Sequence, residues 1–165
     1  MTDQEIISKY GQPGDPTKLT IITLPYPMRI AWDVTKSVKK IQCHQLIADK
    51  LLLVFNEVLN HYGFAEINRL GIDLYGGCVN VRLMRGSKTK WSRHAWGIAI
   101  DLDPIRNSLK TTWERSQFSK PEYKFLVDTF YKHGFINYGK EKKRRENWGW
   151  GRNKTIMLIG ILLVI

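Results

Sequence analysis

The chain has 165 residues, of which 43% are hydrophobic and 12% are aromatic. This composition excludes a disordered chain and suits one compact domain with a sizeable core. Lysine and arginine outnumber aspartate and glutamate by 26 to 15, and the net charge of +11 favours polyanionic surroundings such as nucleic acid, teichoic acids or anionic lipid. The simpler interpretation of this charge is a solvated basic surface.

The first half of the chain predicts an arm, a strand and a long helix. Residues 1–20 are polar and contain several glycines and prolines, so we expect an irregular N-terminal arm. Residues 19–32 then predict an extended segment that two prolines interrupt. Across residues 43–62, apolar side chains recur at helical spacing until Gly63, which predicts the strongest helix of the sequence.

Short strands follow this helix. Residues 72–75 and 79–83 flank the glycine pair at 76 and 77, so we expect two strands around a turn. Residues 99–102 predict another strand. Its alternation places Ala99, Asp101 and Asp103 on a solvent-facing side and apolar residues on the other side.

A second helix is expected from Pro121 to Gly134, with apolar side chains along one face. No repeat, linker or low-complexity segment divides the chain. We therefore predict a single-domain α+β fold in which helices pack against a small, mainly antiparallel sheet.

The most informative stretch is Ser92-Arg93-His94-Ala95-Trp96-Gly97-Ile98-Ala99-Ile100-Asp101. It contains an imidazole, on His94, and a carboxylate, on Asp101, both of which are ligand types that zinc accepts. Gly97 permits a bend between the segment that carries His94 and the strand that carries Asp101. This stretch is half of a metal site, and the spacing alone identifies nothing more.

The pattern Ser-x-His-x-x-Gly-x-Ala-x-Asp resembles the zinc motif of the D-alanyl-D-alanine carboxypeptidases and the phage L-alanyl-D-glutamate endolysins, which cut peptidoglycan stem peptides. The resemblance covers roughly residues 11–138. It includes Leu24-Pro25-Tyr26-Pro27-Met28-Arg29, Gly71-Ile72-Asp73-Leu74-Tyr75-Gly76-Gly77-Cys78, Arg82 with Met84-Arg85-Gly86, and Asp101-Leu102-Asp103-Pro104.

The resemblance implies a zinc peptidase whose metal is held by a histidine, an aspartate and a second histidine near the C-terminus, with water in the open position. His94 and Asp101 match the first two ligands. Arg85 resembles the arginine that holds the substrate or the transition-state oxygen, although a structural salt bridge is its alternative role. Ser92 resembles the motif serine near the metal and the substrate, and a turn or capping role is its alternative.

Several other polar residues are open candidates. Asp103 could orient a metal ligand, and a turn-forming role is its default. His133 lies at an expected helix end rather than on a metal-binding strand, so it is a poor match for the third ligand. The catalytic base that the family places shortly before its second histidine is not identified here, and Glu141 and Glu146 are the carboxylates available in that region.

The end of the chain departs from the family pattern. No histidine follows His133, and an apolar segment stands where the family has an aspartate, a histidine and a phenylalanine close together. Residues 158–162 can be encoded as TTG ATT GGC ATT TTG, and a shifted frame of that string contains GAT TGG CAT TTT, which encodes Asp-Trp-His-Phe. We hypothesise that this segment is a frameshifted version of an ancestral end that carried the second zinc histidine.

These observations divide the chain into an N-terminal arm (1–20), a zinc-peptidase-like domain (21–154) and an atypical hydrophobic tail (155–165). The tail is shorter than the ~20 residues that a membrane-spanning helix needs, so no membrane span is expected. It could be a buried strand, a disordered sticky end or the frameshift product. Cys43 and Cys78 form no CxxC pair and are expected to be buried thiols.

Three functions remain open. The first is a zinc peptidase that acts on the peptidoglycan stem peptide, and the second is a degenerate, non-catalytic relative that still binds wall peptide. The third is a basic nucleic-acid-binding module, because a basic run at 140–145 precedes Trp148 and Trp150. We favour the first and expect a monomer without a nucleic-acid partner. No signal peptide is recognisable, so we expect cytoplasmic synthesis and action on the bacterial cell wall after release.

Overall fold

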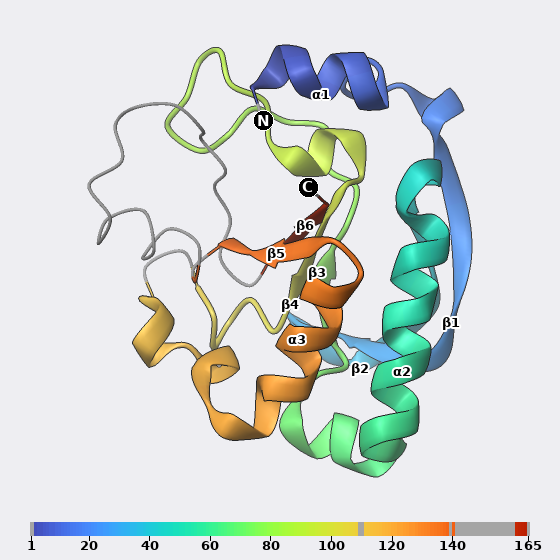
Figure 1. Cartoon of the computed structure of the whole chain (residues 1–165), viewed down its shortest axis with the longest axis vertical. Helices are drawn as coiled ribbons and strands as arrows, with labels where there is room; N and C mark the ends of the chain where they lie inside the picture. The colour runs from blue at the N-terminus through green and yellow to red at the C-terminus, as the bar shows by residue number, and fades with distance from the viewer. Residues whose placement is uncertain (1, 109–110, 139, 141–160, 165) are drawn as a thin grey trace.

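The computed structural model describes residues 2–108, 111–138, 140 and 161–164. Its centre is a six-stranded sheet with the strand order β2-β1-β3-β4-β6-β5 (Figure 1). The strands are β1 (Leu19–Ile30), β2 (Asp33–His44), β3 (Leu74–Gly77), β4 (Ala99–Leu102), β5 (Phe135–Asn137) and β6 (Ile161–Val164). The pair β1 and β3 is parallel and the other four pairs are antiparallel, which confirms the predicted α+β fold with a mainly antiparallel sheet.

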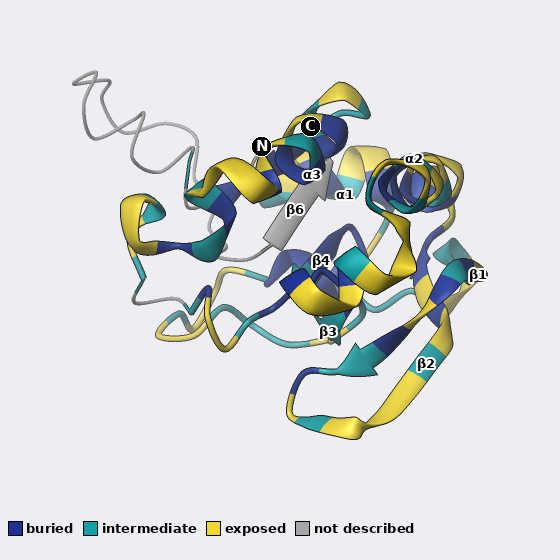
Figure 2. Ribbon diagram, turned by 90° about the horizontal axis from the view of Figure 1, so that it is seen from below, coloured by how far each residue is buried: buried dark blue, intermediate teal, exposed yellow. Residues whose placement is uncertain are grey.

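Three α-helices and five short 3₁₀ segments complete the described part of the chain. The α-helices are α1 (Asp3–Tyr10), α2 (Gln45–Leu70) and α3 (Lys124–Lys132), and the 3₁₀ segments are η1 (Pro16–Lys18), η2 (Arg93–Trp96), η3 (Trp113–Arg115), η4 (Gln117–Ser119) and η5 (Pro121–Tyr123). Figure 2 shows α2 and α3 on the same side of β3 and β4, while β2 forms a largely exposed edge. Among the described helices, none is both long enough and apolar enough to cross a bilayer.

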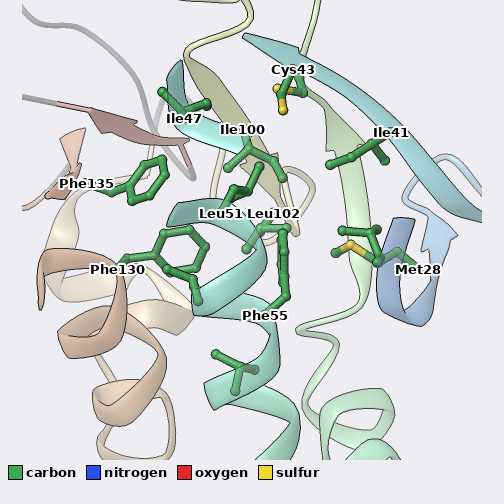
Figure 3. Close-up of a cluster of buried hydrophobic side chains, with 14 of the residues drawn as sticks. Met28, Ile41, Cys43, Ile47, Leu51, Phe55, Ile100, Leu102, Phe130 and Phe135 are labelled. Carbon is green, nitrogen blue, oxygen red and sulfur yellow. The ribbon is translucent and has the colours of Figure 1, made fainter. Parts of the chain in front are cut away.

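The core lies between this sheet and the two longer helices. Leu51 and Phe55 of α2 face Ile100 and Leu102 of β4 in Figure 3, and all four side chains are buried. The ring of Phe130 on α3 meets Phe55 edge-on with centroids 6.1 Å apart. Each large apolar side chain buried in this way contributes about 1.5–3 kcal/mol to folding. The strand that carries Asp101 is therefore fixed from its apolar face.

The expectation of an irregular N-terminal arm is wrong for Asp3–Tyr10, which form α1. Thr2 caps this helix by accepting a hydrogen bond from the Glu5 amide, and the Glu5 side chain bonds back to the Thr2 amide. This reciprocal capping box satisfies two otherwise free donors. Ile6 and Tyr10, one helical turn apart, are buried and dock the helix on the core.

The long helix is confirmed, although it continues beyond the predicted end. Gly63 adopts φ +70°, which interrupts the helical geometry, but the chain resumes the helix and ends α2 at Leu70. The true stop is Gly71, whose left-handed conformation caps the carbonyls of the last turn. Gly63 is thus a kink rather than a terminator.

The first of the two predicted strands, 72–75, is found shifted as β3 (Leu74–Gly77), but the glycine turn and the second strand, 79–83, are wrong. The two glycines at 76 and 77 lie inside β3, which pairs with β1 and β4, and residues 79–83 contribute only an isolated bridge between Leu83 and Trp91. A Cβ atom on Gly76 would lie 2.8 Å from the Cβ of Asp101 and 2.7 Å from Cγ of Pro104. This glycine serves the close approach of two strands and not a turn.

Candidate metal centre

The motif bends at Gly97, as the sequence predicts. His94 lies on η2, which ends at Gly97 in the left-handed conformation with φ +65°, and β4 begins two residues later. A Cβ atom on Gly97 would lie 3.0 Å from the backbone nitrogen of His44 and 3.0 Å from Cγ2 of Val79. Both the backbone conformation and the crowding therefore require glycine at the bend that joins the two expected ligands.

The ring of His94 is held in one tautomer. Its Nδ1 atom lies 2.8 Å from the carbonyl oxygen of Cys78. Because a carbonyl only accepts hydrogen bonds, Nδ1 donates to it, and in the tautomer that bears a single proton Nε2 therefore presents a lone pair. The His94 side chain is only 3% exposed, and Nε2 has no hydrogen-bond partner among the described residues. Orientation of the ring by a carbonyl is the usual arrangement behind a metal-binding histidine.

Asp101 presents its carboxylate to that lone pair. Its Oδ2 atom lies 3.4 Å from Nε2 of His94, and Oδ1 is buried without a hydrogen-bond partner in the described part of the chain. Two ligand atoms bound to one tetrahedral zinc ion at about 2.0–2.1 Å are separated by about 3.3–3.4 Å. A lone pair and a carboxylate oxygen that face each other across this distance are two acceptors, which a cation between them would satisfy. The pair therefore fits a zinc ion.

Ser92 stands beside the motif with an unused hydroxyl. It occupies the N-cap position of η2, but its side chain makes no capping hydrogen bond. Its Oγ atom is buried and has no partner among the described residues. The alternative of a side-chain cap is therefore not realised, and the hydroxyl remains available to a ligand.

Arg85 is not brought to the metal pair by any described contact. It is exposed in the connection between Leu83 and Trp91, whose bridge closes the loop. The described residues offer it no salt bridge, so the structural alternative considered for it is not realised within that part of the chain. Its role in holding substrate stays a prediction.

Asp103 lies in a turn, and its side chain is buried rather than solvent-facing. Its φ of +46° is left-handed, and its Oδ2 accepts a hydrogen bond from Nε of Arg106 at 2.7 Å. Burial raises the pKa of Asp103 above its ordinary value, with Arg106 opposing that shift. Ala99 is also buried, so the predicted solvent-facing side holds only for Asp101, whose side chain is 24% exposed. The segments packed over β4 cover the rest of the strand.

The structure does not supply a third ligand from the residues it describes. Within these residues, no group of three or more histidine, cysteine, aspartate or glutamate side chains could hold a metal ion. His133 ends α3 and lies 2.7 Å from Oε1 of Glu57, so it has a different partner. Glu141 and Glu146, with the basic run beyond Lys140, lie outside the described residues.

The tail forms a strand where the structure describes it. Ile161–Val164 form β6, which lies between β4 and β5. Of the three alternatives for the tail, a strand is therefore the one that the structure shows for these four residues. Residues 155–160 and residue 165 lie outside the described residues.

The sequence did not predict the hydrogen bonds that attach the N-terminal segment to the motif around His94. Asp3 accepts hydrogen bonds from Nη1 of Arg93 at 2.7 Å and from the amide of Trp91 at 3.2 Å. The indole of Trp96 donates to the carbonyl of Gly11 at 2.8 Å. The capping box at the start of α1 was the only local signal that this segment is ordered.

Both cysteines are free and buried, as predicted. Burial raises the pKa of Cys43 to about 12 and raises that of Cys78 well above its ordinary value. The Cys78 thiol lies 3.6 Å from the Gly97 carbonyl oxygen. Cys78 therefore serves the site through its backbone carbonyl, which holds His94, and its thiol stays protonated.

Comparison with protein families matches residues 85–154 to a family described as D-alanyl-D-alanine carboxypeptidase. The matched segment contains Arg85, Ser92, His94 and Asp101, and it ends before β6. Comparisons with curated proteins and with solved structures gave no match. The family match supports a peptidase of this type for the part of the chain that carries the metal pair.

Proposed function

We propose that this protein is a zinc peptidase of the endolysin-like type, acting on peptidoglycan stem peptides, and that its activity is reduced because the described zinc site holds only two ligands. One observation carries the proposal. Nε2 of His94 and Oδ2 of Asp101 face each other at 3.4 Å within the segment that matches the carboxypeptidase family.

In this proposal each residue of the site has a separate role. The Cys78 carbonyl keeps the proton on Nδ1 of His94, so that Nε2 can bind a metal, and Asp101 adds a negative charge. A bound zinc ion supplies Lewis acidity, which lowers the pKa of a coordinated water and polarises a peptide carbonyl. We assign Arg85 to the carboxylate of the stem peptide and Ser92 to a hydrogen bond near the scissile bond. No residue is assigned as the general base.

The second candidate is a non-catalytic relative that binds wall peptide. The observation that favours it is the lack of a third ligand within residues 2–108, 111–138, 140 and 161–164. Zinc with two protein ligands is retained weakly, since catalytic sites use three. A nucleic-acid-binding module is the third candidate, and it would show salt-sensitive DNA binding that a chelator does not change.

The test measures zinc content and hydrolysis on the same preparations. We expect the chain to bind zinc and to release peptide from purified peptidoglycan slowly, and we expect His94→Ala and Asp101→Ala to abolish both. His133→Ala is the matched control, because His133 pairs with Glu57 and should leave zinc binding unchanged. Zinc binding without hydrolysis would select the non-catalytic relative. Zinc binding that survives both substitutions would overturn the proposed site.

A further inference from the structure

A basic loop comes directly before the candidate metal centre. Residues 82–92, here called the arm, form a hairpin-like loop that the bridge between Leu83 and Trp91 closes. At its base the amide of Ser92 donates to the carbonyl of Arg82 at 3.1 Å. The arm is therefore an ordered loop with a defined base.

The base of the arm is attached to α1 and to the segment that carries His94. The amide of Trp91 donates to the carboxylate of Asp3 at 3.2 Å, so the arm lies beside the first turn of α1 (Figure 1). The amide of Asn80, two residues before the arm, donates to the carbonyl of His94 at 2.9 Å. A ligand that binds the arm is therefore held next to the candidate metal centre.

The exposed surface of the arm is cationic. No aspartate or glutamate occurs within residues 82–92. In the part of the chain that the structure describes, no ion pair joins an acidic side chain to the exposed cations of the arm. Unneutralised cations on one short loop produce a positive potential that attracts a polyanion. The exposed residues of the arm are Arg85, Gly86, Lys88, Thr89 and Lys90.

We propose that the arm is a docking site for an anionic phosphodiester polymer of the cell wall, of the teichoic acid class, and that Lys88 and Lys90 make the principal contacts. The inference rests on the proposed function, because it assumes that the chain acts on the wall. Arg85 is assigned above to the carboxylate of the stem peptide, so the two lysines exceed what the peptide requires. The polymer would be a second ligand, bound without the metal.

The side chains of the arm favour this polymer over two other polyanions. Proteins that bind single-stranded nucleic acid combine cations with aromatic side chains on which bases stack, and no exposed residue of the arm is aromatic. Binding to an anionic membrane surface combines cations with apolar side chains that enter the lipid, whereas Leu83, Met84 and Trp91 are partly buried. A phosphodiester chain without bases presents charge alone, and lysine binds phosphate as a point charge.

The experiment measures sedimentation of the full chain with purified cell wall that carries teichoic acid, and with the same wall after hydrofluoric acid has removed the polymer. EDTA is present throughout, so that zinc contributes nothing. We expect about 10-fold tighter binding to the intact wall at low salt, and we expect Lys88→Gln combined with Lys90→Gln to abolish this difference. High salt should abolish it as well, because exposed charges are screened.

A charge-matched control separates the arm from the general positive charge of the protein. Lys39→Gln combined with Lys40→Gln removes the same charge from exposed positions of β2, the edge strand of the sheet. This variant should bind the intact wall as tightly as the unaltered chain. An equal loss in both double variants, or no loss in the arm variant, would overturn the assignment. Tighter binding to anionic phospholipid vesicles or to duplex DNA than to free poly(glycerol phosphate) would overturn the choice of polymer.

Hydrolysis of a soluble stem peptide that carries no polymer distinguishes this inference from the proposed function. The double substitution of Lys88 and Lys90 should leave this hydrolysis unchanged, and slower hydrolysis would assign the two lysines to the peptide and overturn the inference. Hydrolysis by the unaltered chain without preference for intact wall would overturn the inference alone. Preference for intact wall that depends on the arm, in a chain that neither binds zinc nor cleaves the peptide, would support the inference and overturn the proposed function.

Discussion

At the scale of single residues, the site depends on which atoms are left without partners. His94 and Asp101 leave ligand atoms unpaired, whereas the second described buried histidine, His44, uses both ring nitrogens. Nε2 of His44 donates to the Tyr10 carbonyl, and Nδ1 accepts from the Leu46 amide at the start of α2. His44 is the N-cap residue of α2, and it is buried.

The buried His44 should make stability depend on pH. Burial lowers its pKa in the folded protein below the value of 6.5, with Lys18 adding to the shift and the Tyr10 and Asp15 contacts opposing it. The unfolded chain therefore binds a proton more readily, and the free energy of unfolding should fall as pH drops below 6.5. His44→Asn keeps a helix-capping acceptor, so urea unfolding between about pH 7 and about pH 5 should show a flatter dependence in this variant. An equal slope in both proteins would contradict this.

Gly76 should matter for metal binding without contacting the metal. In Gly76→Ala the new methyl group would press against the Cβ of Asp101 and the ring of Pro104, so we expect a loss of about 1–3 kcal/mol of stability and weaker zinc binding. Gly77→Ala is the control: its Cβ would meet nothing within 4 Å, although its φ of +124° strains the backbone. Calorimetry and chelator competition on both variants measure the two effects. Equal zinc affinity in the two would contradict the crowding argument.

At the scale of elements, α1 fastens the turn that carries His94. The pair of Asp3 and Arg93 joins the first turn of α1 to η2, and the Arg93 side chain is only 7% exposed. A second link runs from the amide of Gly14 to the carbonyl of Ala95 at 2.7 Å. α1, which has its own capping box, thus holds in place the segment that carries His94.

Removing the charge of Asp3 should weaken the attachment of α1 to η2. Asp3→Asn replaces the carboxylate that pairs with the nearly buried guanidinium of Arg93 by a neutral amide, so we expect a loss of about 2 kcal/mol in the free energy of unfolding. Asp49→Asn on the exposed side of α2 is the matched control and should change stability little. Chemical denaturation of both variants measures the difference. A loss for Asp3→Asn no larger than the control's would show that α1 docks through its apolar face alone.

At the scale of the whole molecule, features encoded within one segment were predictable. The periodicity of α2 and α3, the strand at 99–102 and the bend at Gly97 were each visible in a few residues. The two glycines of β3 were misread as a turn, because Gly76 instead permits close approach to a strand more than twenty positions away in the chain. The approach of His94 to Asp101 was predictable for the same reason, since both residues belong to one short motif.

The surroundings of His94 and Asp101 depend on contacts between distant segments. No local pattern indicates that the apolar tail would supply a strand between β4 and β5, or which of its residues would stand opposite Asp101. The burial of Asp103 likewise depends on Arg106 and on segments that pack over β4. These contacts are set by the pairing of distant strands, which no short stretch of the sequence predicts.

The place of β6 between β4 and β5 has a consequence for folding kinetics. Strands β4 and β5 do not pair with each other, so the sheet joins them only after the later residues of β6 have been synthesised and inserted. Until then, the edge of β4 beside Asp101 is open, and an open edge is a template for pairing with other chains. Closure over such long separations is slow. The edge of β4 that carries Asp101 is therefore covered only once β6 has inserted between β4 and β5, so slow insertion of β6 should leave this edge open to pairing with other chains.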